Sequence, residues 1–299
     1  MKLAIVIPIY NGLAYTKKCL ENLDKNIPEN KKDKFHVVIV DDGSTDGSGE
    51  WIKTHYPGVT VINGTGGLWW SGGMNVGIHH VLEKTSANYI LWWNNDILPG
   101  KDYFVNLFAI LEKNDPKTII GSKIYMDIGR KIIWSMGGIF QPVTGKKYMI
   151  GFKQEDRDIY NHITQADWLP GMGTVIHRSI FEDIGYLDNK NFPQYHGDSE
   201  FTYRAKSKGY KLEVHPNLRI WNDTTHTGIK HGGNFKNFKM TLFGIKSNYN
   251  IHKDLKFYHM YARGPQAYIP MASKYFKYVG GFFKWKVLGM FNIQKPSQP

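Results

Sequence analysis

The chain has 299 residues, of which 41% are hydrophobic and 21% charged, so it is long enough and apolar enough to bury a core. This composition excludes an intrinsically disordered protein. Its single cysteine, Cys19, excludes an internal disulfide and a cysteine-based zinc site, and it fits a reducing compartment. The formal net charge of +12 calls for anionic partners, such as nucleoside diphosphates, nucleic acid or an anionic lipid surface.

The start of the chain, MKLAIVIP, has an apolar run too short for a signal peptide and no small-residue cleavage site, so it is predicted to be the first strand. No apolar stretch reaches the roughly 18 residues that a membrane-spanning helix needs. The sequence therefore predicts a soluble or peripheral protein of the cytoplasm. It contains no helix-turn-helix, zinc-finger or RNP-like pattern, so a nucleic-acid partner is not predicted.

Strand-like and helix-like runs alternate along the first part of the chain, as in an α/β fold with a mostly parallel sheet. The predicted strands are residues 3–7, 35–40, 59–62 and 89–93, and the predicted helices are 13–23, 48–55, 74–82 and 103–112. Between 119 and 163, short β-like pieces at 132–134 and 147–150 predict a hairpin insertion over the site. A strand at 173–177 and helices at 179–184 and 200–208 are predicted to follow.

The last part of the chain, residues 233–299, is rich in Lys, Tyr and Phe and is predicted to be a helical C-terminal extension after a catalytic domain at 1–232. Aromatic rings alternate with ammonium groups over 274–288. Such a mixture suits the interface of an anionic membrane. The alternative is a helix that packs on the catalytic domain.

Carboxylates follow two apolar runs that are predicted to be buried strands. Residues 41–46 (DDGSTD) follow the run at 37–40, and residues 94–96 (NND) follow the run at 89–93. In an open α/β sheet the carboxyl ends of strands form the ligand crevice. Neighbouring carboxylates repel each other unless a cation compensates, so a divalent metal with a phosphorylated ligand is the expected occupant.

Several short segments occur in an order typical of one enzyme family. They are VIPIYNG (6–12), VDDGSTDGS (40–48), GGL (66–68) running to GGMNVG (72–77), NND (94–96), GMG (171–173) and GDSE (197–200). With these segments, residues 1–228 resemble family 2 glycosyltransferases of the GT-A fold, particularly the bacterial rhamnosyltransferase-like branch. The fold expected from this resemblance is a Rossmann-like, mostly parallel sheet flanked by helices.

The resemblance implies an inverting, metal-dependent glycosyltransferase of bacterial surface polysaccharide synthesis. Its donor would be a nucleoside-diphosphate sugar, with UDP or dTDP, and its acceptor a hydroxyl of a glycan or of a polyprenyl-diphosphate-linked glycan. Inversion implies one direct displacement with no enzymic nucleophile. The implied location is peripheral, at the inner face of the cell membrane.

The donor site implied by the resemblance lies at the end of the first two strands. Asp41 would read the base, because a carboxylate accepts a hydrogen bond from a pyrimidine ring N–H; Asp42 would assist at the base or ribose. Trp69 and Trp70 either stack on a base or sugar ring or form a wall of the pocket. The predicted donor-binding residues are Pro8, Tyr10, Asn11, Asp41, Asp42, Gly67, Trp70, Asn75 and Asn95.

The metal site implied by the resemblance is the DxD motif, whose last aspartate binds Mg²⁺ or Mn²⁺ on the donor diphosphate. It corresponds here to Asn94-Asn95-Asp96, in which only Asp96 is charged, and the loss of the first acid is expected to weaken the site. His226 matches a family histidine that helps to hold the metal or the diphosphate. Histidine is a good ligand for Mn²⁺ and a poor one for Mg²⁺.

The general base implied by the resemblance is Asp198, in a motif usually written Glu-Asp-x-Asp. This chain departs from the motif at Gly197 and Glu200. Glu200 is assigned either to acceptor binding or to a supporting position behind the base, and His196 is a neighbour on the acceptor side that would tune this pair. Trp168 and Gly171 are also assigned to the acceptor side. A helix N-terminal cap is the alternative role for Asp198.

Two other functions are left open by the sequence. A sugar nucleotidyltransferase shares a similar topology, but it expects a glycine-rich loop with Arg and Lys soon after the first strand, where this chain has PIYN (8–11). A noncatalytic binder of carbohydrate or nucleic acid is supported only by aromatic residues and charge.

Overall fold

A computed structural model describes residues 1–126, 131–223 and 234–290 of the chain. The chain divides into two compact units. The first comprises Met1–Ile139 and Tyr148–His226, and the second comprises Phe140–Lys147 and Thr227–Pro299.

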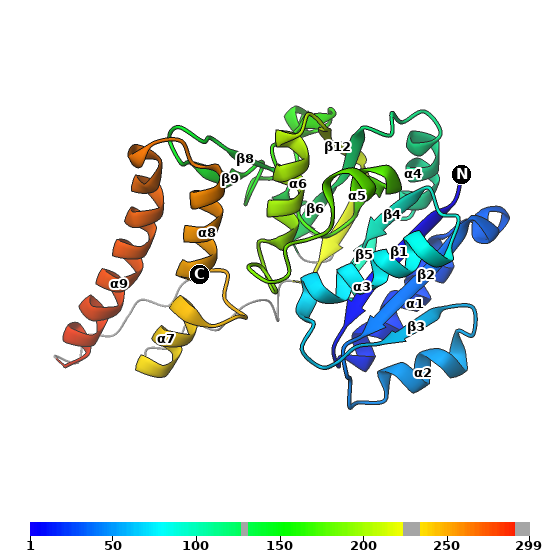
Figure 1. The fold of residues 1–299 in the computed structure, drawn as a ribbon, viewed down its shortest axis with the longest axis horizontal. Helices are drawn as coiled ribbons and strands as arrows, with labels where there is room; N and C mark the ends of the chain where they lie inside the picture. Colours follow the sequence, from blue (N-terminus) through cyan, green and yellow to red (C-terminus); the bar gives the residue numbers. More distant parts are fainter. Residues whose placement is uncertain (127–130, 224–233, 291–299) are drawn as a thin grey trace. The chain divides into compact units, whose positions relative to one another are not determined.

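The first unit begins with alternating strands and helices, as predicted from the sequence (Figure 1). They are β1 (Leu3–Ile9), α1 (Leu13–Asn26), η1 (Glu29–Lys34), β2 (Phe35–Asp41), α2 (Ser48–His55), β3 (Thr60–Asn63), α3 (Trp69–Lys84), β4 (Tyr89–Trp92), β5 (Ile97–Pro99) and α4 (Tyr103–Leu111). The rest of the unit is built of β6 (Thr118–Met126), β7 (Ile132–Ser135), η2 (Asp158–Tyr160), β10 (Thr164–Gln165), β11 (Thr174–His177), α5 (Arg178–Ile184), α6 (Gly197–Ser207) and β12 (Lys211–Asn222).

The main sheet has the strand order β10-β12-β6-β11-β4-β1-β2-β3, with β5 paired to β12 and β7 to β6. Strand β1 is parallel to both β2 and β4, with Ile9 opposite Asp41 and Val6 opposite Trp92. Strand β11 runs antiparallel to β4. The carboxyl ends of β2, β1 and β4 and the amino end of β11 therefore lie along one edge of the sheet.

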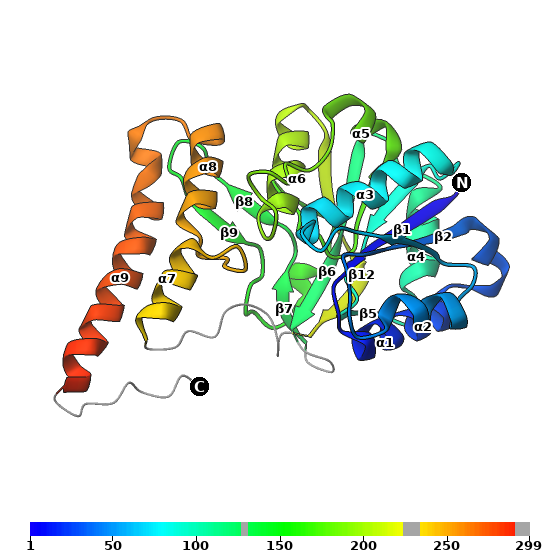
Figure 2. The same ribbon diagram turned by 60° about the horizontal axis from the view of Figure 1, so that its bottom comes forward.

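Helices cover both faces of this sheet, and alternate side chains of β1 are therefore buried against helices on either face. One core cluster joins Leu3, Ile5 and Ile7 of β1 to α1, α2 and α4, and a second joins Ala4 and Val6 to α3, α5 and α6. Figure 2 shows α1 and α2 along one side of the sheet and α3 along the other. The result is a three-layer α/β/α arrangement.

Two segments differ from the sequence prediction. Residues 118–126, predicted to begin an inserted hairpin, form the long strand β6 between β12 and β11 in the main sheet. Residues 211–222, to which no strand was assigned, form β12, whose buried and exposed residues alternate. One hairpin insertion was predicted within 119–163, and the structure has two antiparallel pairs there, β6 with β7 and, in a separate sheet, β8 (Gly138–Phe140) with β9 (Lys147–Met149).

The second unit is helical, with α7 (Phe235–Phe243), α8 (Ile251–Tyr261), η3 (Pro265–Tyr268) and α9 (Ile269–Met290). The tip of the β8–β9 hairpin belongs to this unit: Tyr258 Oη donates to the Gly145 carbonyl oxygen at 2.6 Å, and the Phe140 ring lies edge-on to Phe257. The unit thus has a core of its own, contributed by two distant parts of the chain.

Within the described residues, no helix combines the length with the hydropathy that crossing a bilayer requires.

Candidate active site

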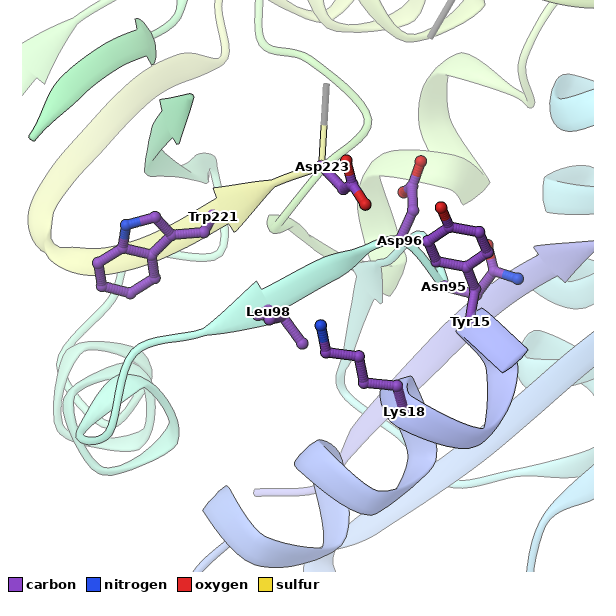
Figure 3. Close-up of a pocket in the computed structure, with 7 residues that line it drawn as sticks. All are labelled: Tyr15, Lys18, Asn95, Asp96, Leu98, Trp221 and Asp223. Carbon is purple, nitrogen blue, oxygen red and sulfur yellow. The ribbon is translucent and has the colours of Figure 1, made fainter. Parts of the chain in front are cut away.

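The turn after β4 and the end of β12 form a small polar pocket. Strand β5 pairs antiparallel with β12, with Asn222 opposite Ile97, and the Asp223 amide donates to the Asp96 carbonyl oxygen at 3.3 Å. This register brings Asp96 and Asp223 together, and Figure 3 shows both carboxylates on the same side of the strands. The residues that line the pocket are Tyr15, Lys18, Asn95, Asp96, Leu98, Trp221 and Asp223.

The electrostatics of this pocket favour a cation. Burial raises the pKa of Asp96 to about 6, and the negative charge of Asp223 raises it as well. Among the described residues, the buried Asp96 Oδ1 has no hydrogen-bond partner. An orphaned carboxylate oxygen next to a second carboxylate fits a hard divalent cation such as Mn²⁺ or Mg²⁺, which prefers oxygen ligands.

The second predicted metal ligand, His226, lies outside the described residues. Within them, no group of three or more His, Cys, Asp or Glu side chains is arranged to hold a metal. The described part of the chain thus offers two carboxylates, and any further ligands would come from a bound diphosphate, water or residues outside it.

Trp70 connects this turn to the predicted general base. Its Nε1 donates to Asn94 Oδ1 at 2.9 Å, and its backbone amide donates to Gln194 Oε1 at 3.1 Å. The ring lies so close to Gly171 that a Cβ atom at position 171 would be 2.3 Å from Trp70 Cζ2. Trp70 therefore packs between the turn and the 171–173 segment.

Asp198 lies at the start of α6, and its carboxylate is fixed by two backbone amides. Gly171 N donates to Oδ2 at 2.7 Å and Ser199 N donates to Oδ1 at 2.8 Å. His196 occupies the N-cap position without a side-chain capping hydrogen bond, and its φ of 64° is in the left-handed region, as is that of Tyr195. Two consecutive left-handed residues other than glycine are costly, and such strain is typically found at functional sites.

Two residues assigned to the acceptor side are buried. Glu200 is fully buried and its carboxylate accepts hydrogen bonds from Arg204 Nε at 2.9 Å and Nη2 at 3.3 Å. Trp168 is 8% exposed, and its indole occupies the space where a Cβ atom of residue 138 would lie. For Glu200 this favours the supporting role, one of the two predicted for it, over direct acceptor contact; for Trp168 an acceptor contact stays a prediction, and in the structure its indole packs against residue 138.

The predicted base-reading residue, Asp41, ends β2 and is 6% exposed. Its Oδ1 accepts from Ser44 N at 2.8 Å, and the Ser44 hydroxyl accepts from Asn11 N at 2.7 Å. Asn11 Oδ1 in turn accepts from Thr45 N at 2.8 Å. The ends of β1 and β2 are thereby joined into one polar edge, next to which Tyr10 is 59% exposed.

Asp42 is occupied within the protein. Its carboxylate accepts hydrogen bonds from three backbone amides, those of Gly66 at 2.8 Å, Leu68 at 2.8 Å and Trp69 at 3.1 Å. This pattern fixes the loop that leads into α3. A contact of Asp42 with the base or ribose stays a prediction, and it would use the acceptor position that the three amides leave on the carboxylate.

Two other residues predicted to bind the donor, Asn75 and Asn95, make hydrogen bonds within the protein. The Asn75 side chain donates to the Leu187 carbonyl oxygen at 2.9 Å and accepts from Leu187 N at 3.0 Å. Asn95 Nδ2 donates to Thr16 Oγ1 at 3.0 Å, while Asn95 also lines the pocket. Gly67 is exposed, with open space where a Cβ atom would lie.

The glycines after residue 71 serve helix packing. Helix α3 begins at Trp69 instead of at the predicted residue 74, so these glycines lie inside it. A Cβ atom at Gly77 would be 2.3 Å from Val6 Cγ1, and one at Gly73 would be 3.0 Å from Pro8 Cβ. The glycines allow α3 to approach β1 closely.

The pocket also contains three residues that were not predicted from the sequence: Asp223, Tyr15 and Lys18. For Asp223 a signal was present: alternation of apolar and polar residues over 211–222 predicts a strand, and an aspartate directly after a strand end is the same pattern that singled out Asp41. Tyr15 and Lys18 carry no such signal, because a helix surface rich in polar residues usually faces solvent.

The chain belongs to glycosyltransferase family 2: residues 4–185 match the model of that family, described as glycosyl transferase family 2. Among curated proteins, it is 24% identical over 197 residues to the low-salt glycan biosynthesis hexosyltransferase Agl10 of Haloferax volcanii. That match covers 63% of this chain and 59% of the relative, so the chain spans about three fifths of the relative's length.

Solved structures confirm the GT-A fold expected from the resemblance. The mannosyltransferase PcManGT from Pyrobaculum calidifontis, in complex with GDP-Man and Mn²⁺, matches with a TM-score of 0.56 and 16% identity, over 93% of this chain and 69% of that one. GalNAc-T7 with UDP, GalNAc and Mn²⁺ matches with a TM-score of 0.58 and 15% identity, over 74% of this chain and 43% of that one. At these identities the likeness establishes the fold.

Proposed function

We propose that this protein is an inverting glycosyltransferase that uses Mn²⁺ or Mg²⁺ to transfer a sugar from a nucleoside-diphosphate donor, with UDP or dTDP, to a hydroxyl of a glycan or lipid-linked acceptor. The observation that carries the proposal is the chain of contacts from the Asp96 turn through Trp70 and Gly171 to Asp198. These contacts join the turn to which we assign the cation and the Asp198 carboxylate at one edge of the sheet. Family membership and the Mn²⁺ and nucleotide complexes of related folds support it.

In this proposal Asp198 accepts the proton of the acceptor hydroxyl as the hydroxyl attacks the anomeric carbon. The two backbone amides that donate to Asp198 orient its carboxylate for this role. General-base catalysis of this kind contributes about 10²–10⁴-fold. His196, one turn before Glu200, would border the acceptor.

Asp96 would hold the divalent cation, which when bound neutralises charge on the leaving diphosphate. Asp41, together with Pro8, Tyr10 and Asn11, would contact the nucleoside at the ends of β1 and β2. Positioning of both substrates at this edge would supply most of the remaining rate enhancement.

The test is incubation of the protein with UDP- and dTDP-sugars and Mn²⁺, followed by analysis of the products. Slow release of free nucleoside diphosphate, faster with acceptor, supports the proposal. Release of pyrophosphate would identify a nucleotidyltransferase, and absence of any turnover across donors would favour a noncatalytic binder. A thermal-shift panel of nucleoside diphosphates identifies the base, because a ligand that binds only the folded state raises the melting temperature.

We further propose that the second unit docks the enzyme on an anionic membrane, as part of glycan synthesis at the inner face of the cell membrane. Residues 234–290 contain nine lysines and one arginine against a single aspartate, Asp254. On α9, Ile269, Phe276 and Phe283 are 64%, 79% and 53% exposed, interspersed with lysines. Exposed rings and ammonium groups on one helix suit the headgroup region.

Vesicle sedimentation tests this docking. The wild-type protein should bind phosphatidylglycerol vesicles and release them as salt rises, and it should bind phosphatidylcholine vesicles poorly. Phe276→Ser with Phe283→Ser should weaken binding, whereas Val105→Ser, at a 54% exposed position on α4, should not. Equal binding by all variants would reject the docking role of α9.

A further inference from the structure

The motif at the turn after β4 has one carboxylate, and its two asparagines are already engaged. Asn94 Oδ1 accepts from Trp70 Nε1 at 2.9 Å, and Asn95 Nδ2 donates to Thr16 Oγ1 at 3.0 Å. Neither asparagine adds negative charge to the site. A divalent cation at this turn would therefore meet a single charge from the motif, which is weak neutralisation for a hard dication.

A second carboxylate reaches the same place from a distant part of the chain. Strand β12 ends at Asn222, which is opposite Ile97 of β5. The backbone amide of the following residue, Asp223, donates a hydrogen bond to the Asp96 carbonyl oxygen. Both side chains line one pocket, and Figure 3 shows their carboxylate groups turned to the same side while Trp221 points away.

The surroundings of Asp96 disfavour its charged form. Asp96 Oδ1 is buried and, within residues 1–126, 131–223 and 234–290, has no hydrogen-bond partner. A buried carboxylate oxygen that lacks a donor costs free energy, and a like charge beside it adds to that cost. A cation bound between the two carboxylates would remove both penalties. The pocket therefore favours a bound cation.

We propose that Asp223 is the second carboxylate ligand of the divalent cation, and that it replaces the acid missing from the Asn94-Asn95-Asp96 motif. The inference rests on the metal-dependent function proposed above and names a ligand that the motif does not contain. The cation would be Mn²⁺ or Mg²⁺, which share the preference for carboxylate oxygens. Lys18, on the α1 side of the same pocket, limits the net negative charge there.

The assignment is tested by measuring Mn²⁺ binding to the full chain, with and without UDP. Binding is monitored as the loss of the electron paramagnetic resonance signal of free Mn²⁺. Asp223→Asn keeps the shape of the side chain and removes its charge, and it should weaken Mn²⁺ binding by about tenfold or more, as Asp96→Asn should. Asp223→Glu, which keeps a carboxylate, should retain most of the affinity. Asp102→Asn, at an exposed carboxylate outside the pocket, should leave it unchanged.

Lys18→Gln separates ligation from a general effect of charge. The alternative is that Asp223 attracts the cation electrostatically without coordinating it. In that case Lys18→Gln, which removes a positive charge, would tighten Mn²⁺ binding by the same factor by which Asp223→Asn weakens it. Ligation by Asp223 predicts a change of less than about threefold for Lys18→Gln against tenfold for Asp223→Asn. Equal and opposite factors would overturn the proposal.

The outcomes also separate this proposal from the proposed function. If Asp223→Asn binds Mn²⁺ as tightly as wild type and Asp96→Asn does not, Asp223 is not a ligand and the proposed function stands. If neither substitution weakens binding, the assigned metal site itself is wrong. Each variant is melted in parallel, and Asp223→Ser replaces Asp223→Asn should the latter lose its cooperative transition.

Discussion

Trp70 Nε1 donates a hydrogen bond of 2.9 Å to Asn94 Oδ1, so the first turn of α3 is tied to the turn that carries Asp96. Trp70→Phe keeps the ring and removes the donor, which leaves the Asn94 oxygen without this bond. A net hydrogen bond contributes about 0.5–1.5 kcal/mol, so we expect a rate loss of roughly threefold to tenfold from a less ordered turn. Steady-state kinetics at fixed Mn²⁺ measures this. Trp51→Phe on α2 is the matched control, and equal rates for both variants would contradict the role of Trp70.

Removal of the Asp198 charge should affect turnover and not donor binding. Asp198→Asn loses the group that takes the acceptor proton, so we expect kcat to fall by about 10²–10⁴-fold. The affinity for nucleoside diphosphate, measured by calorimetry, should stay within about twofold, since the predicted donor contacts are elsewhere. Glu182→Gln on α5, whose side chain is 56% exposed, is the control. Turnover close to wild type in Asp198→Asn would exclude Asp198 as the base.

Asp42 should be important for stability. Its carboxylate accepts three backbone amides of the 66–69 loop, and an asparagine in its place would turn an NH₂ group toward at least one of them. An unsatisfied buried donor costs about 1–3 kcal/mol, so Asp42→Asn should lower the free energy of unfolding by that amount. Urea denaturation measures the loss. The exposed pair of Asp24 with Lys32 provides a control, because Asp24→Asn should change stability by about 0.5 kcal/mol or less.

The sequence predicted most of the fold because its strongest signals are local. The apolar run at 37–40 lies on β2 and residues 89–92 form β4, and carboxylates follow at both strand ends, as the pattern predicts. The second unit was harder to predict. Its core includes the hairpin tip at Phe140–Lys147, which contacts residues more than a hundred positions later, such as Tyr258. A contact between such distant segments has no local pattern in the sequence.

The candidate site was predictable only in part, for the same reason. Asp198 and Asp96 are marked by their motifs, and their linkage through Trp70 depends on tertiary contacts that a motif does not contain. Glu200 shows the opposite case. It has the residue type expected of a ligand-binding group, but its pairing with Arg204, one helical turn later, directs the carboxylate into the core.

Asp96 should destabilise the metal-free protein. Burial raises its pKa from the usual 3.8 to about 6, so the charged form is penalised by about 1–3 kcal/mol once the pH exceeds 6. Because the folded-state pKa is raised, the protein is relatively stabilised below pH 3.8 and loses that contribution as the pH rises through 6. Asp96→Asn should therefore melt at a higher temperature than wild type at pH 8 in a chelator, with a smaller gain at pH 5, while activity is lost.

Added Mn²⁺ should reverse this order. The wild-type protein gains stability from the bound cation, whereas Asp96→Asn gains little. Asp33→Asn, at a carboxylate outside the pocket, should behave as wild type in both conditions. A lower melting temperature for Asp96→Asn than for wild type in the chelator at pH 8 would show that the carboxylate is stabilised by the protein alone.

The second unit should become more stable as the pH rises above 8. Lys253 is 4% exposed on α8, its Nζ donates to the Ile245 carbonyl oxygen, and burial lowers its pKa to about 8 against the opposing effect of Asp254. Between pH 8 and the usual value near 10.5 the unfolded chain binds more protons than the folded one, so stability increases with pH. Lys253→Met removes the group and should flatten the melting temperature over pH 8 to 9.5, a window that stays below the ionisation of unfolded tyrosines near pH 10. Lys256→Met, at an exposed position on the same helix, should keep the wild-type slope, and a wild-type slope in Lys253→Met as well would mean that Lys253 is protonated at no cost.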